Sequence, residues 1–391
     1  MQNKTCSHHE DPWSSCWNKT GVVYRPTWVE IDQAAFRQNI KNIQRYIGAK
    51  TSIIAVVKAN AYGHQAVPLA RCAVKAGVKI LGVSSIEEGI TLREAGISAP
   101  ILILGSLYQL ENLAVALRHR LIPTVSSFQG LQEFSRCAKR QNIIGAFHLK
   151  IDTGMGRIGI SPNNALRLID KIVSLKTIKL DGIYTHFSSA DTDAVYTRQQ
   201  QEKLSVVAAY ARKAGLRCMV HAANSAAFLK QKNFCCDAVR PGLSMYGLLP
   251  FESAAAKIKV KPVLSWKTHI VFLKRVPRQT SISYDRTFVT KRMSVIATLP
   301  VGYADGYNRL LSNKGSVLVR GVRCPVVGKV TMDMIMVDVT AVPAVAIGDE
   351  AVLIGSQGKK SITVEEMARA IGTISYEITC AIGARVPRIL I

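Results

Sequence analysis

Residues 53–104 read IIAVVKANAYGHQAVPLARCAVKAGVKILGVSSIEEGITLREAGISAPILIL, and three short aliphatic runs in this stretch alternate with longer segments of helical periodicity. The same rhythm continues to residue 240, after an opening helical segment near residues 33–46. Eight candidate strands follow in chain order: IIAVV (53–57), ILGVS (80–84), ILIL (101–104), IPTV (122–125), FHLKI (147–151), LDGIYT (180–185), RCMVH (217–221) and CDAVR (236–240). Eight βα units in about 235 residues predict a (β/α)8 TIM barrel.

The composition of the chain and its pattern of predicted elements change after Pro262. Residues 263–391 are rich in Val, Ile and Thr, are punctuated by Gly and Pro, and contain one clear helical stretch near residues 362–371. This pattern is typical of a mostly β domain, and 391 residues exceed the roughly 250–300 at which single cores stop growing. We therefore expect a flexible extension over 1–24, an α/β barrel over 25–262 and a mostly β C-terminal domain over 263–391.

Composition argues against several classes of protein. No apolar run approaches the roughly 20 residues of a membrane helix, and the first 24 residues lack the apolar stretch of a signal peptide. The nine cysteines are scattered and show no spacing typical of a zinc site, which indicates a reducing compartment. We expect a cytoplasmic protein with no membrane partner and no metal.

The net charge of +25 raises the question of a nucleic-acid partner. A nucleic-acid-binding protein concentrates Lys and Arg on one face, whereas here the basic residues are dispersed, the densest stretch being KIKVK at 257–261. We therefore expect a solvated basic surface and no nucleic acid. A positive field also favours anionic ligands such as a phosphate or a carboxylate.

Polar residues gather directly after the predicted strands, where a (β/α)8 barrel carries its active site. They are Lys58 after the first strand, residues 152–157 after the fifth, His186 after the sixth, His221, Asn224 and Ser225 after the seventh, and Arg240 and Gly242 after the eighth. Lysine, histidine and arginine converging at one rim indicate a site for an anionic ligand. Ser225 at a helix start and Gly242 in a loop suit a phosphate, because the loops after the last two strands often bind one.

Lys58 has two interpretations from its position alone. A lysine at the end of an apolar strand is partly desolvated, which favours the neutral amine and allows a Schiff base with an aldehyde cofactor. The alternative is a lysine whose charged end reaches solvent at the barrel mouth.

The segment AVVKANAYGH (55–64) resembles the pyridoxal-phosphate-lysine motif of the alanine racemase family. Further segments resemble the motifs of this family in the family's order: HLKIDTGMGRIG (148–159), IYTHFSSAD (183–191), HAANSAA (221–227), VRPGLSMYGL (239–248), SISYDRTF (281–288), PVGYADGYNR (300–309), GKVTMDM (328–334) and YEITCAIGARVPRI (376–389). The resemblance covers nearly all of the chain from Thr27 to the C-terminus. A lone K-A-N is weak evidence, but this ordered set is specific.

The resemblance implies a racemase that uses pyridoxal 5'-phosphate to interconvert L-alanine and D-alanine, and that supplies D-alanine for cell-wall peptidoglycan. It implies a head-to-tail homodimer whose active sites lie between the subunits. Lys58 and Tyr284 would be the two catalytic bases, on opposite faces of the substrate Cα. Lys58 would also bind the cofactor, and Tyr284 would reach in from the partner subunit.

The resemblance also assigns residues to the cofactor and the substrate. The cofactor-binding residues that it implies are Lys58, Tyr62, His186, Asn224, Ser225, Arg240, Gly242 and Leu243. Arg157 and Met332 would bind the substrate, and Tyr303 would either lie at the substrate entrance or pack at the dimer interface. Lys150 would either be carbamylated, to orient the substrate-binding arginine, or be a charged lysine paired with a carboxylate such as Asp152.

Arg240, which the resemblance places at the pyridine nitrogen, has a chemical consequence. Arginine stays protonated in proteins, so it donates a hydrogen bond to that nitrogen but does not protonate it. The ring is then a weaker electron sink than one paired with a carboxylate, which favours simple proton return over transamination. This pairing argues for a racemase against an aminotransferase.

Two residues depart from the family pattern. Ala384 stands where relatives often carry a tyrosine that contacts the cofactor phosphate, which removes a hydrogen bond worth roughly 0.5–1.5 kcal/mol. Asp285 stands where glycine is common, directly after Tyr284. It either alters the surroundings of that tyrosine or pairs with Arg286.

Other functions compete with this interpretation. A broader-specificity racemase acting on serine is the nearest, and a pyridoxal-phosphate-dependent amino-acid decarboxylase is the next. Such decarboxylases usually pair the ring nitrogen with a carboxylate, whereas this chain has Arg240. A non-catalytic cofactor-binding protein would lack Tyr284 or the second domain, and both are present.

Overall fold

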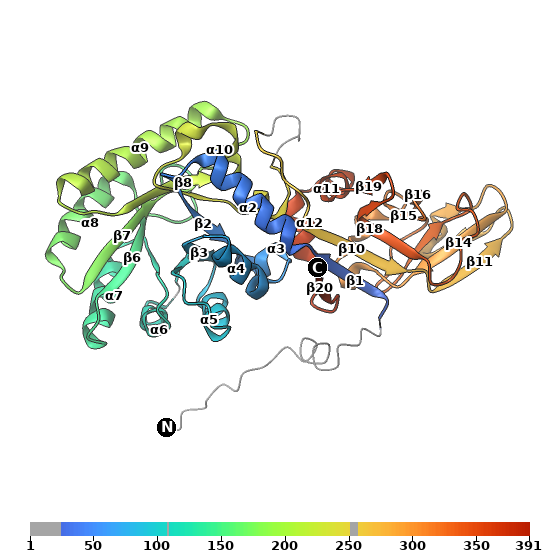
Figure 1. Cartoon of the computed structure of the whole chain (residues 1–391), viewed down its shortest axis with the longest axis horizontal. Coiled ribbons are helices and arrows are strands. Elements are labelled where there is room, and N and C mark those ends of the chain that lie inside the picture. Colours follow the sequence, from blue (N-terminus) through green and yellow to red (C-terminus); the bar gives the residue numbers. More distant parts are fainter. Residues whose placement is uncertain (1–24, 108, 251–256) are drawn as a thin grey trace, which may run out of the picture. The chain divides into compact units, whose positions relative to one another are not determined.

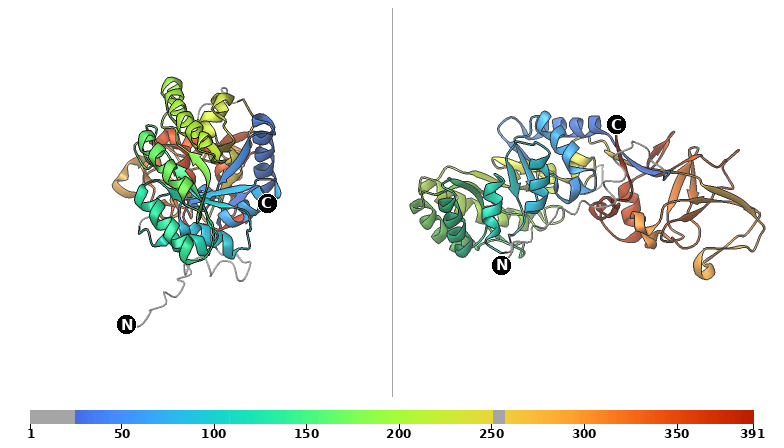
Figure 2. Two further views of the ribbon diagram at one scale, coloured as in Figure 1. Left: turned by 90° about the vertical axis from the view of Figure 1, so that its left-hand side faces the viewer. Right: turned by 90° about the horizontal axis from the view of Figure 1, so that it is seen from below.

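The computed structural model describes residues 25–107, 109–250 and 257–391, so the extension predicted over 1–24 lies outside the described residues. The described chain divides into two compact units (Figures 1 and 2). One is Gln33–Lys261, and the other joins the residues up to Asp32 with Pro262–Ile391.

The first unit is a barrel of eight parallel strands in the order β4-β3-β2-β9-β8-β7-β6-β5. Backbone hydrogen bonds between Ile122 and the two residues Ile101 and Ile103, at 2.8 and 2.9 Å, join the two ends of this order. The strands are β2 (Ser52–Val56), β3 (Ile80–Val83), β4 (Ile101–Ile103), β5 (Thr124–Val125), β6 (Gly145–Lys150), β7 (Ile178–Tyr184), β8 (Met219–Asn224) and β9 (Ala238–Arg240). All eight predicted strands are confirmed, and so is the TIM-barrel class.

Helices surround these strands, coloured blue to yellow in Figures 1 and 2. They are α2 (Gln33–Ile47), α3 (Lys58–Tyr62), α4 (Ala66–Lys75), α5 (Ile86–Glu94), α6 (Asn112–Arg118), α7 (Phe128–Arg140), α8 (Pro162–Ser174), α9 (Ala194–Lys213) and α10 (Ser225–Lys230). Helix α8 shows why such segments fold. Ser161 caps its first turn, Pro162 occupies its first position, and Leu168, Ile169 and Ile172 bury one face against the barrel unit's core.

One strand ends later than its sequence indicated. Strand β8 was expected to end at His221, with Asn224 beyond it, but it continues to Asn224. The small side chains of Ala222 and Ala223 are fully buried, and the pairing with β9 shifts register between His221 and Asn224. His221 therefore lies inside the barrel wall instead of in a loop.

The second unit is mostly β, as predicted. A seven-stranded sheet runs in the order β16-β15-β18-β10-β1-β20, with β19 paired to β18, and it is accompanied by the sheets β11-β14-β17 and β12-β13. These strands are β1 (Thr27–Ile31), β10 (Leu264–His269), β11 (Phe272–Val276), β12 (Ser281–Ile282), β13 (Phe288–Val289), β14 (Ser294–Leu299), β15 (Ser316–Val319), β16 (Val322–Pro325), β17 (Ile335–Asp338), β18 (Glu350–Gln357), β19 (Lys360–Ile362) and β20 (Arg388–Leu390).

Strand β1 corrects the expected domain boundary. Residues 25–32 were assigned to the barrel, but β1 pairs antiparallel with β10 and parallel with β20 in the second unit. Its alternating pattern buries Thr27, Val29 and Ile31 completely, and the Thr27 hydroxyl lies 2.7 Å from that of Thr268. Alternation predicts a half-buried strand but does not identify the sheet that receives it.

The second unit also contains a helix that the sequence did not indicate. One helix was predicted near residues 362–371 and is present as α11 (Val364–Ile371), but α12 (Ser375–Ala381) follows it. Helix α12 is short and carries β-branched residues, which favour strands, and it forms because Ile378 and Thr379 are buried. Within the described ranges, no helix has the length and apolar character needed to cross a bilayer.

Candidate active site

Lys58 begins helix α3 at the end of β2, as predicted, and the backbone that follows it is unusual. Residues 59–62 have φ values of 50, 52, 56 and 54°, which places four consecutive non-glycine residues in the left-handed region. Backbone bonds from Ala61 to Val57 and from Gly63 to Ala59, at 2.9 and 3.0 Å, close this left-handed turn. The turn carries Lys58 at its start and Tyr62 at its end.

Three polar groups form a cradle between this turn and the loops after β8 and β9. The Ser225 hydroxyl accepts a hydrogen bond from the Gly242 amide at 3.1 Å and from the Ser244 amide at 3.4 Å. A Cβ on Gly242 would lie 2.5 Å from the Tyr62 hydroxyl oxygen, so glycine is required for this approach. The structure thus brings together Tyr62, Ser225 and Gly242, with Leu243 following at the start of a 3₁₀ helix.

Asn224 lies beside this cradle and caps a helix. Its side-chain oxygen accepts a hydrogen bond from the Ala227 amide at 3.0 Å and caps helix α10, the first residue of which is Ser225. Because the cap fixes the start of the helix, it also fixes the Ser225 hydroxyl.

Arg240 is buried at the end of β9 and donates to four acceptors. Its guanidinium lies 2.8 Å from His221 Nδ1, 2.7 Å from both the Thr185 and Ala222 carbonyl oxygens, and 3.3 Å from His186 Nδ1. Arginine has no acceptor, so both Nδ1 atoms must accept. These bonds hold the guanidinium at the centre of the barrel rim.

The hydrogen bond from Arg240 fixes the tautomer of His221 and, through it, the hydrogen bond to His148. With Nδ1 of His221 accepting, its Nε2 carries the proton and donates to His148 Nδ1 at 2.8 Å. Burial lowers the pKa of His148 to about 4, and burial together with the Arg240 charge holds the pKa of His221 well below its usual range. Both rings are therefore neutral near neutral pH.

Positive charges from several strands meet around His186. Burial comes first among the causes that hold its pKa well below the usual range, followed by the charges of Arg240, Lys150, Arg157 and Lys58. The charges of Arg240, Lys150, Arg157 and Lys58 thus all act on His186, and the roles assigned to these residues stay predictions. The rim is strongly electropositive, which suits an anionic ligand.

Lys150 is buried at the end of β6, with its Nζ 4.3 Å from the centre of the Tyr184 ring. Burial and the charges of Arg240 and Arg157 hold its pKa well below the usual range, which favours the neutral amine. Among the residues that the structure describes, Lys150 forms no ion pair with Asp152. The Asp152 charge nevertheless acts on Lys150 and raises its pKa, so the carbamylated lysine and the charged lysine both stay predictions.

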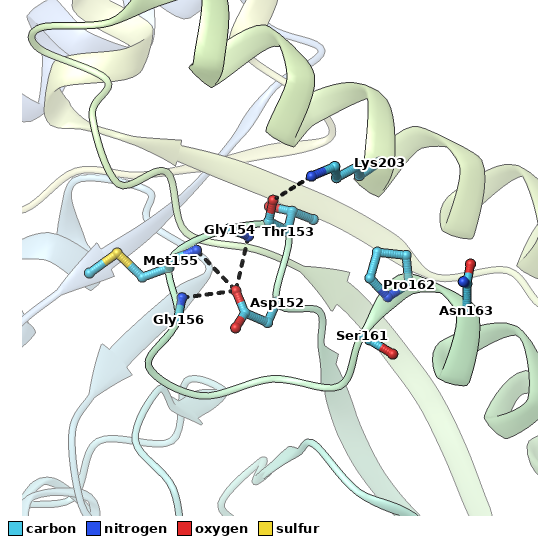
Figure 3. Close-up of a pocket in the computed structure, with 9 residues that line it drawn as sticks. All are labelled: Asp152, Thr153, Gly154, Met155, Gly156, Ser161, Pro162, Asn163 and Lys203. Carbon is cyan, nitrogen blue, oxygen red and sulfur yellow. Dashed lines mark hydrogen bonds between the residues drawn. The ribbon is translucent and has the colours of Figure 1, made fainter.

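Asp152 instead organises the loop that leads to Arg157 (Figure 3). Its Oδ1 accepts the backbone amides of Gly154, Met155 and Gly156 at 3.0, 2.9 and 3.1 Å. Burial raises the pKa of Asp152, but these three amides outweigh it and the net shift is downward. The loop borders an open pocket of ≈ 570 Å³ lined by Asp152, Thr153, Gly154, Met155, Gly156, Ser161, Pro162, Asn163 and Lys203.

The predicted residues of the second unit lie near one another on its surface. Tyr284 is 67% exposed and Met332 is 53% exposed. The amide of Ala304, next to Tyr303, donates to the Met332 carbonyl at 3.0 Å, and the Ser283 hydroxyl, next to Tyr284, donates to the Lys329 carbonyl at 2.7 Å.

Asp285 and Ala384, the two departures from the family pattern, also lie in this unit. The Asp285 carboxylate pairs with Lys329 and not with Arg286, which was one of the two alternatives. This ion pair holds the pKa of Asp285 below its usual range. Ala384 is exposed and offers no hydrogen-bonding side chain.

Sequence reasoning missed three residues of the barrel site. They are His148, Tyr184 and Glu88, whose carboxylate accepts a hydrogen bond from the amide of Ala59 in the turn after Lys58. His148 precedes Lys150 by two positions in β6, so both side chains face the same side of the strand, and this spacing could have identified it. The Tyr184 ring stacks on the His221 ring, with the ring centres 4.6 Å apart and an angle of 7° between the ring planes. No sequence signal marks this contact, because the two residues lie in different strands.

A barrel whose rim combines a lysine on a strained turn, a hydroxyl-and-amide cradle and a buried arginine defines an enzyme site for a phosphorylated or carboxylated ligand. Two family descriptions match the chain: "Alanine racemase, N-terminal domain" over residues 31–250 and "Alanine racemase, C-terminal domain" over residues 263–390. The chain belongs to the alanine racemase family, a family of isomerases.

Individual relatives align with this chain over almost its whole length. The alanine racemase of Halothermothrix orenii is 47% identical over 368 residues, which are 94% of this chain and 97% of that protein. The alanine racemase of Symbiobacterium thermophilum is 46% identical, over 93% of this chain and 97% of that protein. The crystal structure of the Bacillus anthracis alanine racemase with bound L-Ala-P has a TM-score of 0.88 and 38% identity, covering 95% of this chain and 96% of that one.

Proposed function

We propose that this chain is an alanine racemase that interconverts L-alanine and D-alanine with pyridoxal 5'-phosphate as its cofactor, working as a cytoplasmic homodimer. The observation that carries the proposal is the convergence, at one electropositive rim, of Lys58, the Tyr62–Ser225–Gly242 cradle and the Arg240 guanidinium. Relatives named alanine racemase match the chain over at least 93% of its length.

The residues at this rim fit the cofactor group by group. Lys58 would hold the aldehyde carbon, and the Tyr62 and Ser225 hydroxyls with the Gly242 and Leu243 amides would hold the phosphate. The contact between Gly242 and the Tyr62 hydroxyl leaves no space for a Cβ, as expected for a cradle that brings backbone close to a phosphate. When bound, the cofactor withdraws electrons from the substrate Cα and makes its proton acidic.

Arg240 supports racemisation over other reactions of the same cofactor. Its fixed guanidinium would donate to the ring nitrogen without protonating it. His221 and His148 behind it are neutral, so they supply no proton to that position. The proton removed from Cα therefore returns to Cα.

Two bases on opposite faces then complete the reaction. Lys58 takes or delivers the Cα proton on one face, and Tyr284 of the partner subunit does so on the other. The exposure of Tyr284, together with that of the neighbouring Met332, supports a role at a surface that a second subunit covers. Tyr303 would lie at the substrate entrance beside them.

Arg157 would bind the substrate carboxylate, and Lys150, once carbamylated, would orient Arg157. Burial favours the neutral amine of Lys150, and its nitrogen would form a bond to the carbon of carbon dioxide with release of one proton to solvent, which leaves a carbamate with one negative charge. That charge would offset the positive charges of the buried Arg240 and of Arg157, which is exposed.

The test is incubation of the protein, reconstituted with pyridoxal phosphate, with L-alanine in D₂O. Optical rotation that decays to zero, with deuterium appearing at Cα, establishes racemisation. Lys58→Ala should show neither change. Tyr284→Phe should lose racemisation but, with L-alanine and D-alanine tested separately, should still exchange deuterium into the enantiomer whose Cα proton faces Lys58. Absence of exchange in the wild-type protein with cofactor bound would refute the function, and a monomeric mass in solution would refute the dimer.

A further inference from the structure

The left-handed turn after Lys58 needs something to hold it. L-residues avoid this conformation because Cβ approaches the following carbonyl oxygen, and residues 59–62 adopt it four times in succession. A strained segment of this kind persists only where the surrounding structure fixes it. A residue outside the turn, Glu88, contacts its first amide.

The Glu88 carboxylate binds both the start of this turn and the end of the neighbouring strand. One oxygen accepts the Ala59 amide at 2.7 Å, and the other accepts the Ser84 amide at 2.6 Å. Ala59 is the residue directly after Lys58, and Ser84 directly follows β3. These distances are in the short range of charge-assisted hydrogen bonds.

Glu88 is itself held in place by the start of helix α5. Its amide donates to the Ser85 hydroxyl at 3.4 Å, which caps the helix, and Ile86 and Gly89 on either side are buried. The carboxylate is thus attached to a rigid element of the next βα unit. The far end of the turn is held by neutral, local bonds, such as the one from the Ala66 amide to the Asn60 side-chain oxygen at 2.8 Å.

We propose that Glu88 is a positioning residue for the cofactor lysine: its carboxylate holds the Ala59 amide so that Lys58 and Tyr62 face the same bound cofactor. The inference rests on the proposed function. Both carboxylate oxygens are needed, because an amide side chain would present an NH₂ group to one of the two backbone N–H groups. Without the carboxylate, the turn relaxes and the Lys58 amine samples several positions.

The test compares Glu88→Gln and Glu88→Ala with the control Glu94→Gln, which alters the exposed glutamate at the far end of the same helix. We expect the dissociation rate of pyridoxal phosphate from the holoprotein to rise about 10-fold in Glu88→Gln and about 100-fold in Glu88→Ala, following the loss of one and two charge-assisted bonds. The visible circular dichroism of the bound cofactor should weaken in the same order. Glu94→Gln should match the wild-type protein in both measurements.

Hydrogen exchange separates this proposal from the proposed function. The amides of Ala61 and Gly63, which close the turn, should exchange at least 10-fold faster in both Glu88 variants, with or without cofactor. Wild-type exchange at these amides, or wild-type cofactor dissociation in Glu88→Ala, would overturn the positioning role. Failure of the wild-type protein to racemise alanine would instead overturn the function, while the exchange result still decides the role of Glu88.

Discussion

The substitution Gly242→Ala tests the cradle directly. The new Cβ would lie 2.5 Å from the Tyr62 hydroxyl oxygen and 3.0 Å from the adjacent ring carbon. The expected effect is steric, because the Cβ cannot be accommodated while the Tyr62 hydroxyl keeps its position. The Tyr62 side chain has to move by about 1 Å to restore ordinary contact.

The magnitude follows from what that movement disturbs. Tyr62 is buried and packs against Tyr246, with ring centres 5.0 Å apart, so overpacking should lower the free energy of unfolding by about 1–3 kcal/mol. The displaced hydroxyl would also lose its charge-assisted bond to the phosphate, which costs about 1.5–3 kcal/mol and raises the cofactor Kd roughly 10- to 150-fold.

A double-mutant cycle with Tyr62→Phe decides whether the clash is the cause. Tyr62→Phe loses the same phosphate bond, but it also removes the oxygen that the new Cβ meets. The double variant should therefore bind cofactor nearly as well as Tyr62→Phe alone, with an interaction free energy of about 1 kcal/mol or more. Fluorescence titration of the apoprotein measures all four Kd values. Additive losses, or wild-type affinity in Gly242→Ala, would refute the geometry of the cradle.

Three further predictions follow from the buried charges of the barrel. Burial lowers the folded-state pKa of His148 to about 4, below its unfolded value, so its contribution to stability is present above about pH 6.5 and is lost as the pH falls. Urea unfolding should therefore show a free energy of unfolding that is about 3 kcal/mol lower at pH 4 than at pH 7. This difference should be smaller in His148→Gln. Lys150→Met removes the proposed carbamate and should raise the KM for alanine at least 10-fold, because Arg157 is no longer oriented. Mass spectrometry of the native protein should find carbon dioxide bound at Lys150, and an unmodified lysine with full activity would contradict this. Asp152→Ala frees three loop amides and should raise KM about 10-fold with a smaller change in kcat, since it disturbs Arg157 and not the bases; a change confined to kcat would argue against the loop's role.

The sequence by itself determined the barrel and most of the rim. Alternating aliphatic runs and helical segments are local patterns, and the ends of parallel strands meet at one edge, so Lys58, Arg157, His186 and Arg240 could be placed together without coordinates. The family motifs added roles that position alone left open, including that of Tyr284.

The tertiary structure alone decided the pairings between distant segments. Strand β1 joins the second unit's sheet, Asp285 pairs with Lys329, and the Glu88 carboxylate holds the turn after Lys58. Periodicity reports how a segment is buried but not which partner buries it. Hydrogen bonds and ion pairs between residues far apart in the chain depend on that partner, and therefore on the three-dimensional arrangement of each unit.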